Sequence, residues 1–299
     1  MVGRTRAAAL AAAAALLLGG CSRLLDAFVY FPDRSLSGAP GAVGLGYEEV
    51  RFPAADGVEL HGWWVPGEAV GPCIVFFHGN TGNISHRLDI LKRLHNRLGL
   101  GVFLFDYRGY GKSAGKPSEA GLYADARGAR AVVRDRGWGR RGEILFGRSL
   151  GAAVAIQSAV EAPPSALVLE SAFSSLSDLA RIRHPILAQL VSGWLEGRYA
   201  PAETIGRVRA PLLFLHGARD RTVPIGVAWR LYDAAGEPKW FRTLPSAGHD
   251  DLAFVGGAPY WEAWALLLER VDAERPEAAD ARPAPGRPAP PEAGPSGGT

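Results

Sequence analysis

The sequence predicts an α/β domain whose central sheet is mostly parallel and is flanked by helices. Short apolar segments recur along the chain, and each is dense enough to form a strand buried on both faces. Helix-like segments alternate with these strands, which is the order of β-α units. Before the alternation begins, residues 47–52 and 58–66 flank an Asp-Gly turn and have the alternating pattern of a β-hairpin.

The predicted strands and helices follow one another through the middle of the chain, so residues 47–272 are expected to form one domain. The predicted strands cover residues 73–78, 101–106, 143–147, 166–170, 211–216 and 239–245. The predicted helices cover residues 84–98, 119–136, 150–160 and 260–271.

A longer segment, residues 171–210, separates two of these strands. Leu, Ile and Trp recur in it at helical spacing. It therefore forms either a small helical cap over the carboxyl edge of the sheet or two ordinary crossover helices. A cap of this composition favours an acyl or otherwise hydrophobic substrate.

The N-terminus has the pattern of an export signal. Arg4 and Arg6 precede an apolar run too short to span a bilayer comfortably, and Cys21 follows small residues. This arrangement resembles the bacterial lipobox, in which the cysteine is lipidated; an ordinary secretory signal is the alternative. We expect residues 1–20 to be a lipoprotein signal peptide and residues 21–46 an anchor and linker. The protein is then held to the membrane on the exported side of the cell envelope.

The chain has only two cysteines, and they have different predicted roles. More than one acyl chain on Cys21 would make a stable anchor. Ser22 directly after it favours the outer membrane in an organism with two membranes. Cys73 is then left without a disulfide partner and begins an apolar run, so we predict a buried strand residue and not a reactive thiol.

Composition narrows the remaining possibilities. Residues 273–299 are rich in Pro, Ala, Gly and charge, so we expect a disordered tail. The net charge of +3 is spread along the chain without a basic block, which argues against nucleic acid as a partner. We expect a monomer that acts on a small-molecule or acyl substrate.

Three serines lie in a Gly-x-Ser-x-Gly pattern, which is typical of the nucleophile of serine hydrolases: Ser113, Ser149 and Ser296. In a nucleophile elbow the serine sits on a strained turn between a strand and a helix. Ser149 has a predicted strand before it and a helix rich in small residues after it. Ser113 lies in a predicted loop, and Ser296 lies in the tail. We therefore predict that Ser149 is the nucleophile.

A serine nucleophile needs a base and an acid that orients it. His249 lies in a glycine-flanked loop after the last predicted strand, which favours it over the other six histidines. Asp220 follows the strand 211–216 and is the predicted acid, with Glu170 as the alternative. The order Ser, Asp, His matches that of the α/β-hydrolases.

The oxyanion of the intermediate needs two backbone N–H donors. One is predicted to come from Leu150, directly after the nucleophile, and the other from Asn80, in the loop after the strand 73–78. No residue pattern suggests a metal or a cofactor.

Six motifs together resemble the α/β-hydrolase superfamily, and more narrowly its Bem46-like and ABHD17-like branch: HGNTGN, DYRGYGKSAGKPSE, GRSLG, ESAFSSL, HGARDRTVP and GHDDL. The resemblance implies an eight-stranded sheet, a Ser149–Asp220–His249 triad and hydrolysis of esters or thioesters without a cofactor. Eukaryotic relatives include protein depalmitoylases, which are anchored by an N-terminal cysteine cluster that this chain lacks. In that branch the loop with Arg108 and Tyr110 is scaffold, and Arg148 is a narrower family marker.

The leading hypothesis is therefore a lipid-anchored hydrolase of carboxylic esters or thioesters. A serine peptidase of the prolyl-oligopeptidase type is a second enzyme hypothesis, although the sequence has no propeller-sized N-terminal domain. A non-catalytic envelope lipoprotein on a hydrolase scaffold is the alternative from a different class, because a fold alone does not determine function.

Overall fold

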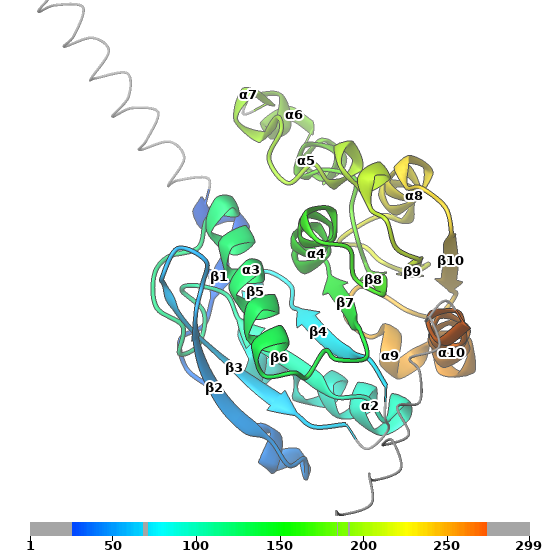
Figure 1. Cartoon of the computed structure of the whole chain (residues 1–299). Helices are drawn as coiled ribbons and strands as arrows, with labels where there is room; N and C mark the ends of the chain where they lie inside the picture. Colours follow the sequence, from blue (N-terminus) through cyan, green and yellow to red (C-terminus); the bar gives the residue numbers. More distant parts are fainter. Residues whose placement is uncertain (1–25, 68–70, 184, 191, 274–299) are drawn as a thin grey trace, which may run out of the picture.

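The computed structural model describes residues 26–67, 71–183, 185–190 and 192–273. Its centre is an eight-stranded sheet with the order β10-β9-β8-β7-β4-β6-β3-β2 (Figure 1). β3 pairs antiparallel with both of its neighbours, and the other strand pairs are parallel. The predicted mostly parallel sheet is therefore confirmed, with the hairpin at its edge. The strands are β2 (Glu48–Pro53), β3 (Glu59–Val65), β4 (Cys73–Phe77), β6 (Val102–Asp106), β7 (Glu143–Arg148), β8 (Ala166–Glu170), β9 (Leu212–Gly217) and β10 (Lys239–Leu244).

Helices cover both faces of the sheet (Figure 1). One face packs against α3 (Glu119–Asp135), α4 (Leu150–Glu161) and α8 (Ile225–Ala234), and the other packs against α2 (Leu88–Leu98) and α10 (Gly257–Ala273). Successive residues of a strand point to opposite faces, so each central strand supplies both cores. In β4, for example, Val75 and Phe77 belong to one core, and Ile74 and Phe76 belong to the other. This two-sided burial explains why the strands are continuous apolar runs.

The predicted strands and helices agree with the structure to within a few residues, and two helices were missed. These are α8 and α9 (Leu252–Val255). In α8 the buried residues Val227, Ala228 and Leu231 have helical spacing after Pro224, a signal that the neighbouring loop residues obscured. The predicted helix at residues 84–98 begins with the 3-10 turn η2 (Ile84–Arg87).

Cys73 is the first residue of β4 and is buried, as predicted. Burial raises the pKa of its thiol to about 12, so the thiol stays protonated and unreactive at neutral pH.

The sequence predicts a linker for residues 21–46, but the described part of this segment, from residue 26 on, packs on the domain. Val29 and Tyr30 are buried, and β1 (Phe31–Pro32) pairs with β5 (Thr81–Gly82) in a separate two-stranded sheet. We name residues 26–37 the N-terminal strap. Its apolar residues have a place in the core, which is why it does not behave as a linker.

The predicted signal peptide, Cys21, Ser296 and all but the first residue of the predicted tail lie outside the described residues. Within the described part of the chain, no helix has both the length and the apolar character needed to cross a bilayer.

The segment 171–210 forms several short helices that stand beyond the carboxyl ends of the central strands (Figure 1). Tyr199, near the end of this segment, hydrogen-bonds through its hydroxyl to Tyr30 of the strap at 2.8 Å. The strap and this helical segment therefore meet above the same edge of the sheet. The short helices are α5 (Leu176–Arg183), α6 (Pro185–Leu190), α7 (Ser192–Leu195), η3 (Pro201–Glu203) and η4 (Ile205–Arg207).

Candidate active site

Ser149 lies at the turn between β7 and α4. Its φ of 52° and ψ of −118° form a combination that residues other than glycine rarely adopt. A Cβ on Gly147 would lie 2.6 Å from the Cα of Ala152. A Cβ on Gly151 would collide with the carbonyl oxygen of Phe77. The two glycines therefore allow strand, turn and helix to pack closely enough to hold Ser149 in this strained conformation.

His249 contacts both of its predicted partners. Its Nε2 lies 3.1 Å from the Oγ of Ser149, and its Nδ1 lies 2.7 Å from the Oδ2 of Asp220. Because the Nδ1–H donates to the carboxylate, Nε2 carries the lone pair that can accept the hydroxyl proton of the serine. The structure thus brings together three residues that lie on three different loops.

The Asp220 carboxylate is buried and fully bonded. Its Oδ1 accepts hydrogen bonds from the backbone N–H groups of Thr222 and Val223, both at 2.8 Å. Burial alone would raise the pKa of Asp220, but the hydrogen bond and charge of His249 hold that pKa below its ordinary value. The carboxylate is therefore ionised at neutral pH. His216 lies 3.5 Å from the same carboxylate, and burial lowers its pKa, which keeps it neutral.

Two residues without a predicted role hold the loop that carries His249. The Ser171 hydroxyl donates to the carbonyl oxygen of His249 at 2.9 Å, and Arg148 Nη2 donates to the carbonyl oxygen of Asp250 at 3.1 Å. These contacts join positions 78 and 102 residues apart, respectively. Local sequence patterns carry no signal for contacts of this range; for Arg148 the only signal was the family marker.

Glu170, the alternative acid, has other partners. Its Oε1 lies 2.5 Å from Arg148 Nε, and its Oε2 accepts a hydrogen bond from the Tyr260 hydroxyl at 2.8 Å. Burial would lower the pKa of Arg148, but the charges of Glu170 and Asp250 together outweigh it and raise that pKa. The carboxylate that contacts the His249 imidazole is therefore that of Asp220.

Asn80 and Leu150, whose backbone N–H groups are the predicted oxyanion donors, line the same pocket as Ser149. Asn80 is bound tightly to the N-terminal strap. Its Nδ2 donates to the carbonyl oxygen of Val29 at 2.6 Å, and its own carbonyl oxygen accepts from the N–H of Phe31 at 3.0 Å. The strap, which the sequence placed outside the domain, is thus part of the framework of this loop.

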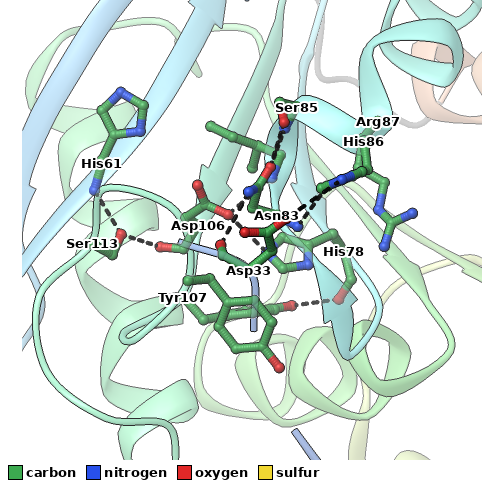
Figure 2. Close-up of polar contacts among 12 residues, drawn as sticks. Asp33, His61, His78, Asn83, Ser85, His86, Arg87, Asp106, Tyr107 and Ser113 are labelled. Carbon is green, nitrogen blue, oxygen red and sulfur yellow. Dashed lines mark hydrogen bonds and ion pairs between the residues drawn. The ribbon is translucent and has the colours of Figure 1, made fainter. Parts of the chain in front are cut away.

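Ser113 shares the sequence pattern of Ser149, but its hydroxyl holds the backbone of a loop. Figure 2 shows its hydroxyl between His61 and Asp106: it donates to the carbonyl oxygen of Asp106 at 2.8 Å and accepts from the N–H of His61 at 3.0 Å. Both partners are backbone groups, so this hydroxyl closes a loop. Arg108, in the same loop, is paired with the buried Asp125 and belongs to the scaffold, as the resemblance implied.

A pocket of about 690 Å³ opens over Ser149 and His249, a volume typical of small-molecule sites. One part of its wall is apolar and another part is polar. The apolar part comes from the strap and from the residues after β8: Phe28, Val29, Phe31, Phe173, Leu176 and Leu179. The polar part contains Asp33, His86, Arg87 and Asp250.

Residues 69–203 match a family model described as serine aminopeptidase, S33. An uncharacterized protein of Mycobacterium tuberculosis is 38% identical over 243 residues, which cover 80% of this chain and 85% of that protein. The alpha/beta hydrolase domain-containing protein WAV2 of Arabidopsis thaliana is 34% identical, covering 84% of this chain and 89% of that protein. The protein bem46 of Schizosaccharomyces pombe is 30% identical, covering 82% of this chain and 85% of that protein.

Two solved structures show the same fold. The esterase Pf2001 of Pyrococcus furiosus has a TM-score of 0.67 at 20% identity, covering 81% of this chain and 98% of that one. The esterase domain of a Rhodothermus marinus protein has a TM-score of 0.54 at 25% identity, covering 74% of this chain and 98% of that one.

Proposed function

This chain belongs to the α/β-hydrolase superfamily, in the family of WAV2 and Bem46, and from that premise we propose that it is a serine hydrolase of carboxylic esters or thioesters. The observation that carries the proposal is the position of His249, hydrogen-bonded to Ser149 on one side and to the ionised Asp220 on the other. This arrangement supplies a serine with a base whose tautomer is defined.

In the proposed reaction, Ser149 Oγ attacks the acyl carbon while His249 Nε2 takes the hydroxyl proton. Asp220 stabilises the resulting imidazolium. The backbone N–H groups of Asn80 and Leu150 stabilise the oxyanion of the tetrahedral intermediate. When the intermediate collapses, the bond to the leaving oxygen or sulfur breaks and His249 returns the proton to it.

The acyl group is then held on Ser149 as an ester. A water molecule gives a proton to His249 while its oxygen attacks the acyl carbon. When this second intermediate collapses, the bond to Ser149 Oγ breaks, His249 returns the proton to that oxygen, and the carboxylic acid is released. The apolar wall formed by the strap and α5 supports an acyl substrate. Two structural neighbours are named as esterases, which also supports an ester substrate. One of them, the esterase domain from Rhodothermus marinus, is 25% identical to this chain.

A fluorophosphonate probe tests this proposal, because it reacts only with an activated serine. We expect the wild-type protein to be labelled and to hydrolyse 4-nitrophenyl butyrate, and the Ser149→Ala variant to do neither. Equal labelling of both proteins, or labelling of neither, would falsify the assignment. The second result would instead favour a non-catalytic envelope protein.

A serine peptidase is the second candidate, and the description of the matching family model as a serine aminopeptidase favours it. Esters and amides pass through the same tetrahedral oxyanion, so the three residues alone do not distinguish them. Comparing kcat/KM for 4-nitrophenyl esters with that for aminoacyl 4-nitroanilides separates the two. Faster turnover of the anilides would replace our proposal with the peptidase.

We further propose that lipid on Cys21 holds the protein to the membrane on the exported side of the envelope. The basic, apolar and small residues before Cys21 support this proposal. Labelling of cells with a clickable palmitate analogue tests it. The wild-type protein should carry the label and the Cys21→Ser variant should not; label that persists in the variant contradicts the anchor.

A further inference from the structure

Arg87 lines the same pocket as Ser149 and His249, at the end of η2. One nitrogen, Nη2, hydrogen-bonds to the carbonyl oxygen of Thr81. Its Nε is shielded from solvent and has no hydrogen-bond partner. Among the residues that the structure describes, no carboxylate lies within ion-pair distance of this guanidinium. Figure 2 shows Arg87 beside His86, with its guanidinium group turned away from the polar contacts drawn there.

The two carboxylates of the pocket wall lie near other side chains. Asp33 Oδ1 accepts from the N–H of Ser35, and its Oδ2 lies 3.9 Å from His86 Nε2. The carboxylate of Asp250 lies 3.7 Å from Arg148 Nη2. The guanidinium of Arg87 is thus the charged group of this wall that forms no ion pair within the described residues.

A guanidinium in this state is suited to an oxyanion ligand. Its planar N–H groups bind the two oxygens of a carboxylate or phosphate in parallel, and a buried N–H without a partner is costly until such a ligand arrives. Burial and the nearby Arg148 lower the pKa of Arg87, which is the direction expected of a cation that lacks a counter-ion. An arginine remains protonated at neutral pH all the same.

Arg87 and Asp250, the residue after His249, both belong to the polar part of the pocket wall, whereas the strap and α5 form the apolar part. In the proposed mechanism, it is the His249 Nε2 that gives the proton to the leaving oxygen or sulfur. An anionic group on that half of the substrate would therefore meet Arg87.

We propose that Arg87 binds an anionic oxygen group, a carboxylate or a phosphate, on the alcohol or thiol half of the substrate. The inference rests on the proposed function and narrows it: the preferred substrates are acyl esters of anionic alcohols or thiols. The acyl half lies along the apolar wall of the strap and α5, and the anionic half lies against Arg87.

Three butyrate esters with related phenolic leaving groups test this. They are 4-butyryloxybenzoate with a carboxylate, 4-butyryloxyphenyl phosphate with a phosphate, and the neutral 4-butyryloxybenzamide. The measured quantity is the ratio of kcat/KM for each anionic ester to that for the neutral ester. Comparing this ratio between variants cancels the intrinsic reactivity of each ester.

The variants are Arg87→Met, Arg87→Lys and the control Arg93→Met. Arg93 lies nearby in the chain, in α2, but its side chain is exposed and lies outside this pocket. Its Cζ is 4.5 Å from the centre of the Phe254 ring. We expect Arg87→Met to lower the ratio about tenfold to a hundredfold, the range for a hydrogen bond to a charged group. Arg87→Lys should keep part of the preference because the charge remains, and Arg93→Met should keep all of it.

A loss for the benzoate alone identifies a carboxylate, a loss for the phosphate ester alone identifies a phosphate, and either supports the inference. An unchanged ratio in Arg87→Met, with the neutral ester still hydrolysed, overturns it and leaves the proposed function intact. If Arg87→Met does not fold, an unchanged ratio in Arg87→Lys overturns it equally. A wild-type protein that hydrolyses no ester and takes no fluorophosphonate would remove both proposals.

Discussion

Arg148 and Glu170 are register partners at the ends of β7 and β8, and their side chains form a buried ion pair beside Ser149. The pair joins two parts of the site. The backbone N–H of Ser149 donates to the carbonyl oxygen of Glu170 at 2.9 Å, and Arg148 Nη2 donates to the carbonyl oxygen of Asp250. One buried pair thus links the serine turn to the loop of His249.

Replacing Arg148 should therefore reduce both stability and activity. In Arg148→Met the Glu170 carboxylate loses its buried partner, which costs about 3–5 kcal/mol of unfolding free energy. The contact with Asp250 is lost as well, so kcat should fall. The double variant Arg148→Met/Glu170→Gln should recover much of the stability but not the activity. Urea unfolding and 4-nitrophenyl butyrate kinetics measure the two effects, and full recovery of activity in the double variant would contradict the link.

Ser149→Ala and Ser113→Ala should separate a chemical role from a structural one. The first should lower kcat on the order of a millionfold and leave the fold intact. The second should keep kcat and fluorophosphonate labelling but lower the unfolding free energy by about 1–3 kcal/mol, since the N–H of His61 is left buried without a partner. Loss of labelling in folded Ser113→Ala would be inconsistent with this division.

Asp220 should make stability depend on pH in the acid range. Its folded pKa is below the ordinary value of 3.8, so its ionisation stabilises the folded state fully above that pH. This contribution is lost as the pH falls through the folded pKa. The difference in unfolding free energy between wild type and Asp220→Asn should therefore shrink as the pH falls below about 4. Urea titrations below about pH 5 measure this difference; a difference that grows as the pH falls through this range would contradict the prediction.

Asp220→Asn also has a kinetic consequence at neutral pH. An amide at this position favours the wrong imidazole tautomer, so kcat should fall about ten-thousandfold. Stopped-flow and steady-state assays with 4-nitrophenyl butyrate measure this. A loss of only a few fold would point to a different orienting acid.

The strap should affect catalysis through the loop of Asn80. Asn80→Ala keeps the backbone N–H but removes the side-chain bond to Val29, so the proposed oxyanion donor is less well held. We expect kcat to fall by up to about tenfold, well short of losing the donor, with KM little changed. Ser35→Ala is the control, because Ser35 is an exposed residue of the strap that does not line the pocket. A change confined to KM would assign Asn80 to substrate binding instead.

Much of the fold was predictable from sequence because each central strand is buried on both faces. Burial on two sides makes a strand an apolar run, and the loops between runs carry glycines and polar residues. The N-terminal strap was not predictable in this way. Its buried residues, Val29 and Tyr30, are too few to form a periodic pattern, and their partners lie far along the chain.

The residues of the site likewise divide into those with a local sequence signal and those that act through contacts with residues distant in sequence. Ser149, Asp220 and His249 each follow a strand and carry a local signal, so sequence order alone indicated them. Arg148, Ser171 and the strap act on that set through contacts with residues remote in sequence.

The sequence by itself determined the parallel sheet, the serine on its strand-to-helix turn, and the candidate acid and base, because these depend on hydrophobic pattern and on local turn chemistry. Only the tertiary structure decided which carboxylate meets the imidazole. It also decided that the strap holds the Asn80 loop and that Arg87 reaches the pocket without a counter-ion. These outcomes depend on how loops from separate strands converge at one edge of the sheet, and no local window of sequence contains that distance information.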